Sequence, residues 1–182
     1  MRRFAICIFL VVAVIGLNSS CAEDQNFNQI EGISIVPTLA TSIFYFESDE
    51  EFINDSSAGQ FYTQLFTFEA FNQDFVADRI LDGFISYQLE NTTSKELEIQ
   101  IEFLDENDNT LDSETFIIEP APAPLLQRQI AYGDGGRSLD ILKNTTNIRV
   151  SGQNLGDNNS ISSLSEPKII LRSSAEFRLR LQ

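Results

Sequence analysis

Side chains that could do chemistry are unevenly represented in this sequence, which has 27 acidic residues, two cysteines and no histidine. The lack of histidine excludes Ser–His–Asp and Cys–His catalysis and His-ligated zinc sites. The segment Gly133-Asp-Gly-Gly136 does not match a phosphate-binding loop or a dinucleotide fingerprint. A carboxylate pair can hydrolyse glycosides without histidine, but among 27 acidic residues close pairs arise by chance. We therefore predict no catalytic residues, and a carboxylate-pair hydrolase is the remote alternative.

Calcium binding is the second chemistry to consider, because Asp105-Glu-Asn-Asp-Asn-Thr-Leu-Asp112 offers oxygen ligands at alternating positions. An EF-hand loop starting at Asp105 requires glycine at its sixth position and glutamate at its twelfth. The chain has Thr110 and Phe116 there. We therefore interpret the segment as a hairpin tip and expect no metal ligands and no cofactor. A weak calcium site of another kind in the acidic half is the alternative.

The third candidate for chemistry is Cys21, which follows a distinctive N-terminal segment. Two arginines precede an unbroken apolar run from Phe4 to Leu17, and small polar residues then lead to Cys21. A basic start, an apolar core and a small-residue exit are the parts of a secretory signal peptide. The run of 14 residues is shorter than the roughly 20 that a membrane-spanning helix needs. We therefore predict export, with residues 1–20 removed.

Because this signal ends on a cysteine, it resembles a bacterial lipoprotein signal of the Bacteroidota type. Ser19 and Ser20 fill the small positions of the lipobox, while Asn18 stands where leucine is usual. The pair Glu23-Asp24 is similar to the export signal of surface lipoproteins in that group. The resemblance implies that Cys21 is lipidated with acyl chains such as palmitate. It also implies an outer-membrane protein that faces the cell exterior. An ordinary cleaved signal is the alternative.

Charge narrows the partners that we expect. Between Cys21 and Pro120 there are 22 acidic and two basic residues, whereas residues 121–182 have five acidic and eight basic ones. Nucleic-acid binding needs a concentrated basic surface and is excluded. An acidic body is repelled by anionic lipid, so the membrane partner is reached through the anchor, and repulsion between copies favours a monomer. Two explanations of the asymmetry stay open: solvation, or pairing of basic C-terminal strands with acidic N-terminal ones.

Period-two alternation dominates the chain after the signal. Residues 96–103 and 176–181 alternate strictly between apolar and polar side chains, as strands with one buried face do. Seven further segments look like strands: 39–46, 61–69, 83–90, 115–118, 126–132, 147–151 and 168–172. Nine candidates predict an all-β, antiparallel sandwich of the immunoglobulin-like kind. We expect one such domain over residues 31–182, with residues 21–30 as a flexible tether.

Less regular segments separate these strands. Pro120-Ala-Pro-Ala-Pro124 should form an extended bridge between strands, since proline cannot join a ladder. Residues 138–143 predict one or two helical turns, and a second short helix is predicted to begin at Ser48, with Glu51 completing a capping box. Residues 154–165, rich in Asn, Ser, Gly and Asp, predict a mobile polar loop.

A family resemblance covers residues 83–120. Phe84-Ile-Ser-Tyr-Gln-Leu-Glu-Asn91, then Leu97 to Asp105, then Leu111 and Ile118-Glu-Pro120 are similar to the FxLYD type of immunoglobulin-like module, with Leu104 in place of the usual tyrosine. The resemblance implies an extracytoplasmic sandwich and no shared catalytic residues.

Together these features predict a non-catalytic, membrane-anchored lipoprotein that serves as a structural or protein-interaction module of the cell envelope. The alternative is an accessory lipoprotein that binds a ligand, either glycan or calcium. Phe44, Phe46, Phe66 and Phe68 sit at strand spacing and are predicted to be core. Exposure of Phe61, Tyr62 and Phe71 would instead mark a contact surface.

Overall fold

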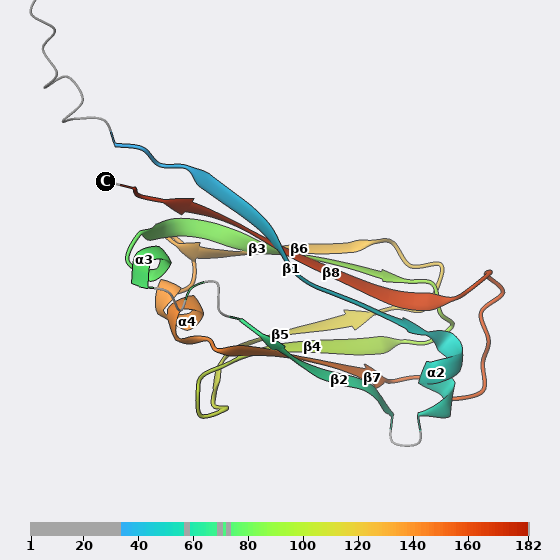
Figure 1. Ribbon diagram of the computed structural model, residues 1–182. Coiled ribbons are helices and arrows are strands. Elements are labelled where there is room, and N and C mark those ends of the chain that lie inside the picture. Colours follow the sequence, from blue (N-terminus) through green and yellow to red (C-terminus); the bar gives the residue numbers. More distant parts are fainter. Residues whose placement is uncertain (1–33, 57–58, 69–70, 72–73, 182) are drawn as a thin grey trace, which may run out of the picture. The chain divides into compact units, whose positions relative to one another are not determined.

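Two packed antiparallel sheets make up the described part of the chain (Figure 1). The computed structural model describes residues 34–181, apart from 57–58, 69–70 and 72–73. One sheet has the order β1 (Thr38–Asp49), β8 (Lys168–Leu179), β3 (Ile80–Asn91) and β6 (Leu126–Gly133). The other has the order β2 (Gln60–Thr67), β7 (Asn147–Asn154), β4 (Leu97–Leu104) and β5 (Thr110–Ile118). The predicted all-β antiparallel sandwich is thus confirmed.

The order of the strands refines that prediction. The β4–β5 hairpin joins neighbours within one sheet, whereas every other connection between consecutive strands crosses from one sheet to the other. This is the arrangement of an eight-stranded jelly roll, built from two Greek keys. An immunoglobulin domain, by contrast, keeps its first two strands together in one sheet. The bridge Pro120–Pro124 connects β5 to β6 and therefore crosses between the sheets.

Alternation along the strands builds the core. In β4 the side chains of Leu97, Ile99, Ile101 and Phe103 are fully buried, because this central strand packs its apolar face against the other sheet. The predicted core phenylalanines Phe44, Phe46 and Phe68 are buried, and Phe66 packs against them partly exposed. Burial of apolar side chains from both sheets in one core is what stabilises a domain without disulfides.

One difference concerns the C-terminal strand. The two predicted strands at 168–172 and 176–181 form a single strand, β8, so the described chain has eight strands where nine were expected. Ser173 and Ala175 are both 4% exposed and continue the inward-facing positions of Ile169 and Leu171. The small side chains of Ser173, Ser174 and Ala175 interrupt the alternation of large apolar and polar residues, so the sequence did not reveal that the strand continues.

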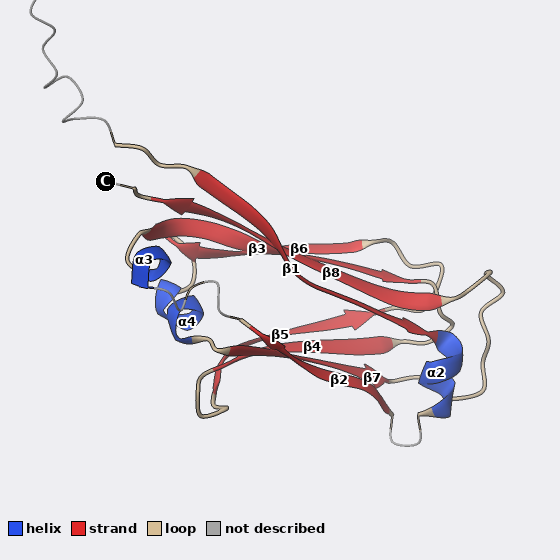
Figure 2. Cartoon of the chain, in the orientation of Figure 1, coloured by secondary structure: helices blue, strands red, loops and turns tan. Residues whose placement is uncertain are grey.

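Three short helices lie at the ends of the sandwich (Figure 2). Helix α4 (Leu139–Asn144) matches the prediction, and the hydroxyl of Ser138 caps it by accepting a hydrogen bond from the Asp140 N–H. Helix α2 (Glu50–Asp55) begins two residues later than predicted, after Asp49, which makes no side-chain cap. The predicted capping box of Ser48 and Glu51 is therefore wrong. Helix α3 (Asp74–Ala77) was not predicted.

The two ends of the sandwich differ. We call the end that carries α2 and the β1–β2, β3–β4, β5–β6 and β7–β8 connections the α2 end. The opposite end, which we call the α3 end, carries α3, α4 and the β4–β5 hairpin tip (Figure 1). The described chain starts at Ser34 and finishes after β8 at the α3 end. No helix among the described residues combines the length and apolarity needed to cross a bilayer.

Candidate functional site

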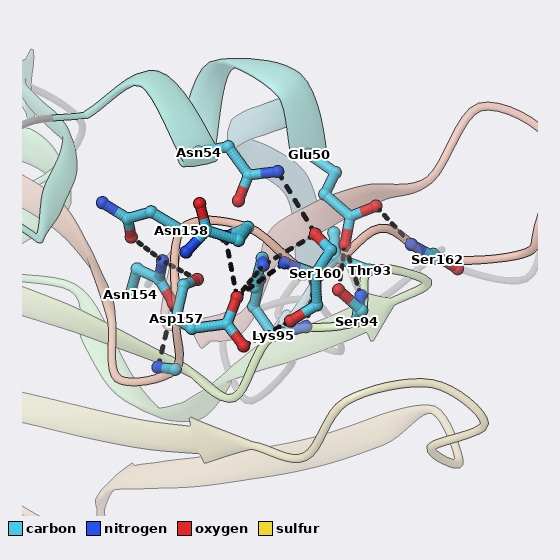
Figure 3. A network of polar contacts seen from close by, with 12 residues as sticks. Glu50, Asn54, Thr93, Ser94, Lys95, Asn154, Asp157, Asn158, Ser160 and Ser162 are labelled. Atoms are coloured by element: carbon cyan, nitrogen blue, oxygen red, sulfur yellow. Dashed lines mark hydrogen bonds and ion pairs between the residues drawn. The ribbon is translucent and has the colours of Figure 1, made fainter.

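Polar side chains from three distant segments meet at the α2 end (Figure 3). They come from helix α2, from the turn 92–96 between β3 and β4, and from the loop 155–167 between β7 and β8. We call these residues the α2-end network: Glu50, Ser94, Lys95, Asp157, Ser160 and Ser162. The predicted site residue, Cys21, lies outside the described residues.

Glu50 is the centre of one half of this network. Its side chain is almost wholly covered, with the residue only 3% exposed. Its carboxylate accepts hydrogen bonds from the N–H of Ser94 at 2.5 Å, from the Ser94 hydroxyl at 2.7 Å and from the N–H of Ser162 at 2.8 Å. Burial alone would raise the pKa of this carboxyl, but the bonds from Ser162 and Ser94 and the charge of Lys95 lower it overall. Glu50 therefore stays ionised and joins the three segments.

Lys95 is the centre of the other half. Its side chain is fully buried, and its ammonium group donates to Asp157 at 3.0 Å and to the carbonyl of Ser160 at 2.8 Å. Asp157 also accepts from the hydroxyl and N–H of Ser160 and from the N–H of Asn159, and these bonds together with Lys95 hold the pKa of its carboxyl far below the ordinary value of 3.8. Lys95 and Asp157 therefore form an ion pair that joins the turn 92–96 to the loop 155–167.

The segment predicted as a polar loop, residues 154–165, is largely a loop, and the network joins it to helix α2 and to the turn 92–96. Asn54 of α2 donates to the carbonyl of Ser160 at 3.3 Å, and the hydroxyl of Ser162 donates to the carbonyl of Thr92 at 2.9 Å. The loop is therefore anchored on both sides of Ile161. Sequence reasoning missed Glu50 and Lys95 because their partners are distant in the chain. The one available signal was Lys95 itself, one of only two basic residues between Cys21 and Pro120.

An acidic groove with a volume of about 820 Å³ lies over this network. Its uncharged walls are Asn54, Pro167 and Ile161, and Ile161 is 78% exposed. Lys168 lies 3.7 Å from Glu47 and is the basic residue of the lining. Six carboxylates line the groove: Glu47, Asp49, Glu50, Glu51, Asp55 and Glu166.

The groove therefore combines a strongly negative rim with the exposed apolar side chain of Ile161. Such a surface can attract a cation-bearing segment electrostatically.

The other candidate chemistries find little to support them in the described chain. At the β4–β5 tip, the Asp105 carboxylate accepts from the N–H groups of Asn107 and Asn109, as in an ordinary hairpin turn. No group of three or more His, Cys, Asp or Glu side chains is arranged for a metal among the described residues. Each described carboxyl with a shifted pKa has it lowered, as in Glu47 and Asp82, whereas a catalytic acid needs a raised one.

The aromatic side chains that would mark a contact surface are largely internal. Phe61 is 4% exposed and Phe71 6%, while Tyr62 is half-buried and packs against the core. The exposed aromatics of the described chain, Tyr45 and Phe52 among them, lie on different elements. An aromatic platform for glycan is therefore not built from the residues singled out in the sequence.

Comparison with known proteins adds little. No protein-family model matches the sequence, and no curated protein matches it. Solved structures resemble it at low identity: the VP2 subviral particle of infectious bursal disease virus (8% identity, TM-score 0.38, 80% of this chain and 33% of that one), a protein of the disulfide-linked pili of Bacillus endospore appendages (9%, 0.38, 83% and 93%), and Desmodium yellow mottle tymovirus (8%, 0.36, 81% and 84%). The chain thus spans about a third of the VP2 chain. These likenesses are too slight to bear on what this chain does.

Proposed function

We propose that this chain is a non-catalytic lipoprotein, anchored in the outer membrane through Cys21 and facing the cell exterior, whose sandwich binds another envelope protein. The observation that carries the binding role is the acidic groove at the α2 end, which Glu50 lines while its hydrogen bonds join helix α2 to Ser94 and Ser162. The anchoring role is supported by the signal that precedes Cys21.

The position of the groove suits this role. The described chain begins at the α3 end of the sandwich, and the groove lies at the opposite, α2 end. A strand of 12 residues such as β8 spans roughly 40 Å. The groove and the first described residue therefore lie at opposite ends of the strands. The carboxylates of the groove favour a partner segment that carries lysine or arginine.

The anchoring half is tested on intact cells with Cys21→Ala, using Cys7→Ala as the matched control within the segment that is removed. The native chain and Cys7→Ala should be cut from whole cells by added protease and stay in the membrane fraction. Cys21→Ala should be released or retained elsewhere, because it lacks the thiol that is acylated. Protection of the native chain until the outer membrane is broken would contradict the exterior location.

The binding half is tested in the same cells by reversing charge in the groove with Glu51→Lys and Asp55→Lys together. In-cell crosslinking should then yield about tenfold less of the native chain's crosslinked complex, a loss that corresponds to roughly 1.4 kcal/mol. The control reverses the same charge at the β4–β5 tip with Glu106→Lys and Asp108→Lys, and should leave the yield unchanged. Equal loss in both pairs would mean that net charge, and not the groove, determines the complex.

A further inference from the structure

On one side of the sandwich long stretches of both edge strands lack charge, although the chain as a whole is strongly acidic and β1 itself ends with Glu47 and Asp49 at the α2 end. Strands β1 and β2 are edge strands on this side, and neither Thr38–Phe46 of β1 nor Gln60–Thr67 of β2 contains a charged residue. The edge strands on the other side carry Asp112 and Glu114 in β5 and Arg128 in β6. Charged side chains are the usual protection of a sheet edge against pairing with another chain. The β1–β2 side does not have this protection.

Aromatic side chains close the gap between these two edges. The rings of Phe44 and Phe66 are stacked 5.3 Å apart, and those of Phe46 and Tyr62 are 3.9 Å apart. We call these four residues the aromatic seam. Phe66 and Tyr62 are only partly buried, so the seam leaves apolar surface uncovered directly beside the open backbone of β2.

Strand β2 is better suited than β1 to accept another strand. Both edges carry a bulge, between Ser42 and Phe44 in β1 and between Gln60 and Tyr62 in β2, and bulges twist an edge away from further pairing. The bulge of β1 lies in the middle of its uncharged part, whereas that of β2 lies at its first residues. Residues Thr63–Thr67, which we call the β2 edge, pair with β7 in unbroken register. Within the part of the chain that the structure describes, no strand pairs with the outer side of this segment. Leu65 is 48% exposed there.

We propose that the β2 edge accepts an extended segment of a partner protein as an additional, antiparallel strand of its sheet. This inference rests on the proposed function. It adds the β2 edge to the groove as a contact surface and specifies the kind of partner segment. Main-chain hydrogen bonds to β2 would supply affinity, and alternate side chains would supply specificity. Side chains of the added strand that face the interior of the sandwich would be apolar, because they would cover Phe66 and Tyr62 of the aromatic seam.

Charge decides between a partner protein and a second copy of this chain. Helix α2, which precedes β2 at Gln60, carries the exposed carboxylates of Glu51 and Asp55. An added antiparallel strand would finish near this helix, so a basic residue at its C-terminal end fits. A second copy would bring more acidic residues, since the chain has a net charge of −15, and such copies repel one another. The partner segment is therefore uncharged in its middle and basic at its C-terminal end.

The test uses the full chain in detergent and a synthetic peptide of alternating threonine and valine with two C-terminal lysines. The matched peptide has the same side chains but N-methylated backbone nitrogens at alternate positions, which removes N–H donors. We expect the unmodified peptide to bind, to slow amide exchange in Thr63–Thr67, and to bind at least about tenfold more tightly than the methylated one. Leu65→Lys should weaken binding about tenfold. Ile117→Lys on β5, which makes the same charge change at a position 54% exposed, should not.

Several outcomes would overturn this inference. Equal binding of both peptides would show attraction by charge alone, and absence of binding or slowed exchange elsewhere would remove the β2 edge from consideration. Self-association of the full chain that Leu65→Lys abolishes would place a second copy on the edge. In cells, a crosslinked complex that is lost on charge reversal in the groove but unchanged by Leu65→Lys would leave the proposed function intact and refute the edge.

Discussion

Glu50 and Glu51 are neighbours in the chain with opposite surroundings, and they allow the α2-end network to be tested at the scale of one residue. Glu50 is 3% exposed and accepts three hydrogen bonds, whereas Glu51 is exposed on the rim of the groove. Glu50→Gln keeps the size of the side chain but removes the charge and one acceptor. We expect it to lower the free energy of unfolding by about 2 kcal/mol, as measured by urea denaturation.

The control for this substitution is Glu51→Gln, which should change the free energy of unfolding by less than about 0.5 kcal/mol. Equal effects of the two substitutions would mean that the bonds of Glu50 to Ser94 and Ser162 add no stability. The sequence did not reveal that Glu50 is buried and Glu51 exposed, because the partners of Glu50, Ser94 and Ser162, lie 44 and 112 residues away. Alternation reports which face of a strand is buried, but it does not report which polar groups meet across loops.

At the scale of elements, strand β8 brings basic residues from the end of the chain next to acidic residues of earlier strands. It lies between β1 and β3, and its basic residues face acidic ones on both neighbours. Lys168 pairs with Glu47 on β1, and Arg172 with Glu90 on β3, each at 3.7 Å. These contacts support the hypothesis that basic C-terminal strands pair with acidic N-terminal ones. Solvation alone would not bring these charges into contact.

A third cross-strand pair, between Arg178 of β8 and Asp82 of β3, gives a prediction. Arg178 donates to Asp82 on β3 through both Nε, at 2.7 Å, and Nη2, a bidentate geometry that exceeds an ordinary surface contact. Arg178→Glu should lower the free energy of unfolding in low salt and lower it less in high salt, because exposed pairs are screened. Thermal or urea denaturation at two salt concentrations would measure this difference.

Arg180→Glu is the matched control, since Arg180 lies two residues further along and is exposed. It should change stability by less than about 0.5 kcal/mol. If both substitutions had the same effect, net charge would explain the result and the Arg178–Asp82 contact would not.

Elements were predictable to the extent that their residues alternate. Strands β4 and β6 were located within one residue of their observed bounds, because apolar side chains mark their inner faces. Strand β8 was divided in two, since Ser173 and Ser174 interrupt that pattern although both pair with β3. The order of strands within each sheet depends on contacts between segments far apart in sequence, so alternation predicted the sandwich but not the jelly roll.

Two opposing electrostatic effects act on the molecule as a whole. Five described carboxyls have a lowered pKa in the folded chain: Glu47, Glu50, Asp82, Asp105 and Asp157. Against this, the net charge of −15 makes the folded chain repel itself at pH 7, and that repulsion vanishes near the isoelectric point of about 4.2. The first effect favours neutral pH and the second favours acid.

We expect the first effect to decide the acid stability of the molecule. A carboxyl whose folded pKa is lowered stabilises the fold above its ordinary value, 4.5 for Glu and 3.8 for Asp, and this contribution is lost as pH falls through the folded pKa. Self-repulsion between solvated charges is screened over about 8 Å at physiological salt, whereas Glu50 would lose direct hydrogen bonds. Urea midpoints should therefore stay level from about pH 7 to 5 and fall steeply between about pH 4.5 and 2. The deficit of Glu50→Gln should shrink over the same acid range, because the wild-type carboxyl is then protonated too. A midpoint that rises towards pH 4 and a deficit that does not change would instead assign the pH dependence to net charge.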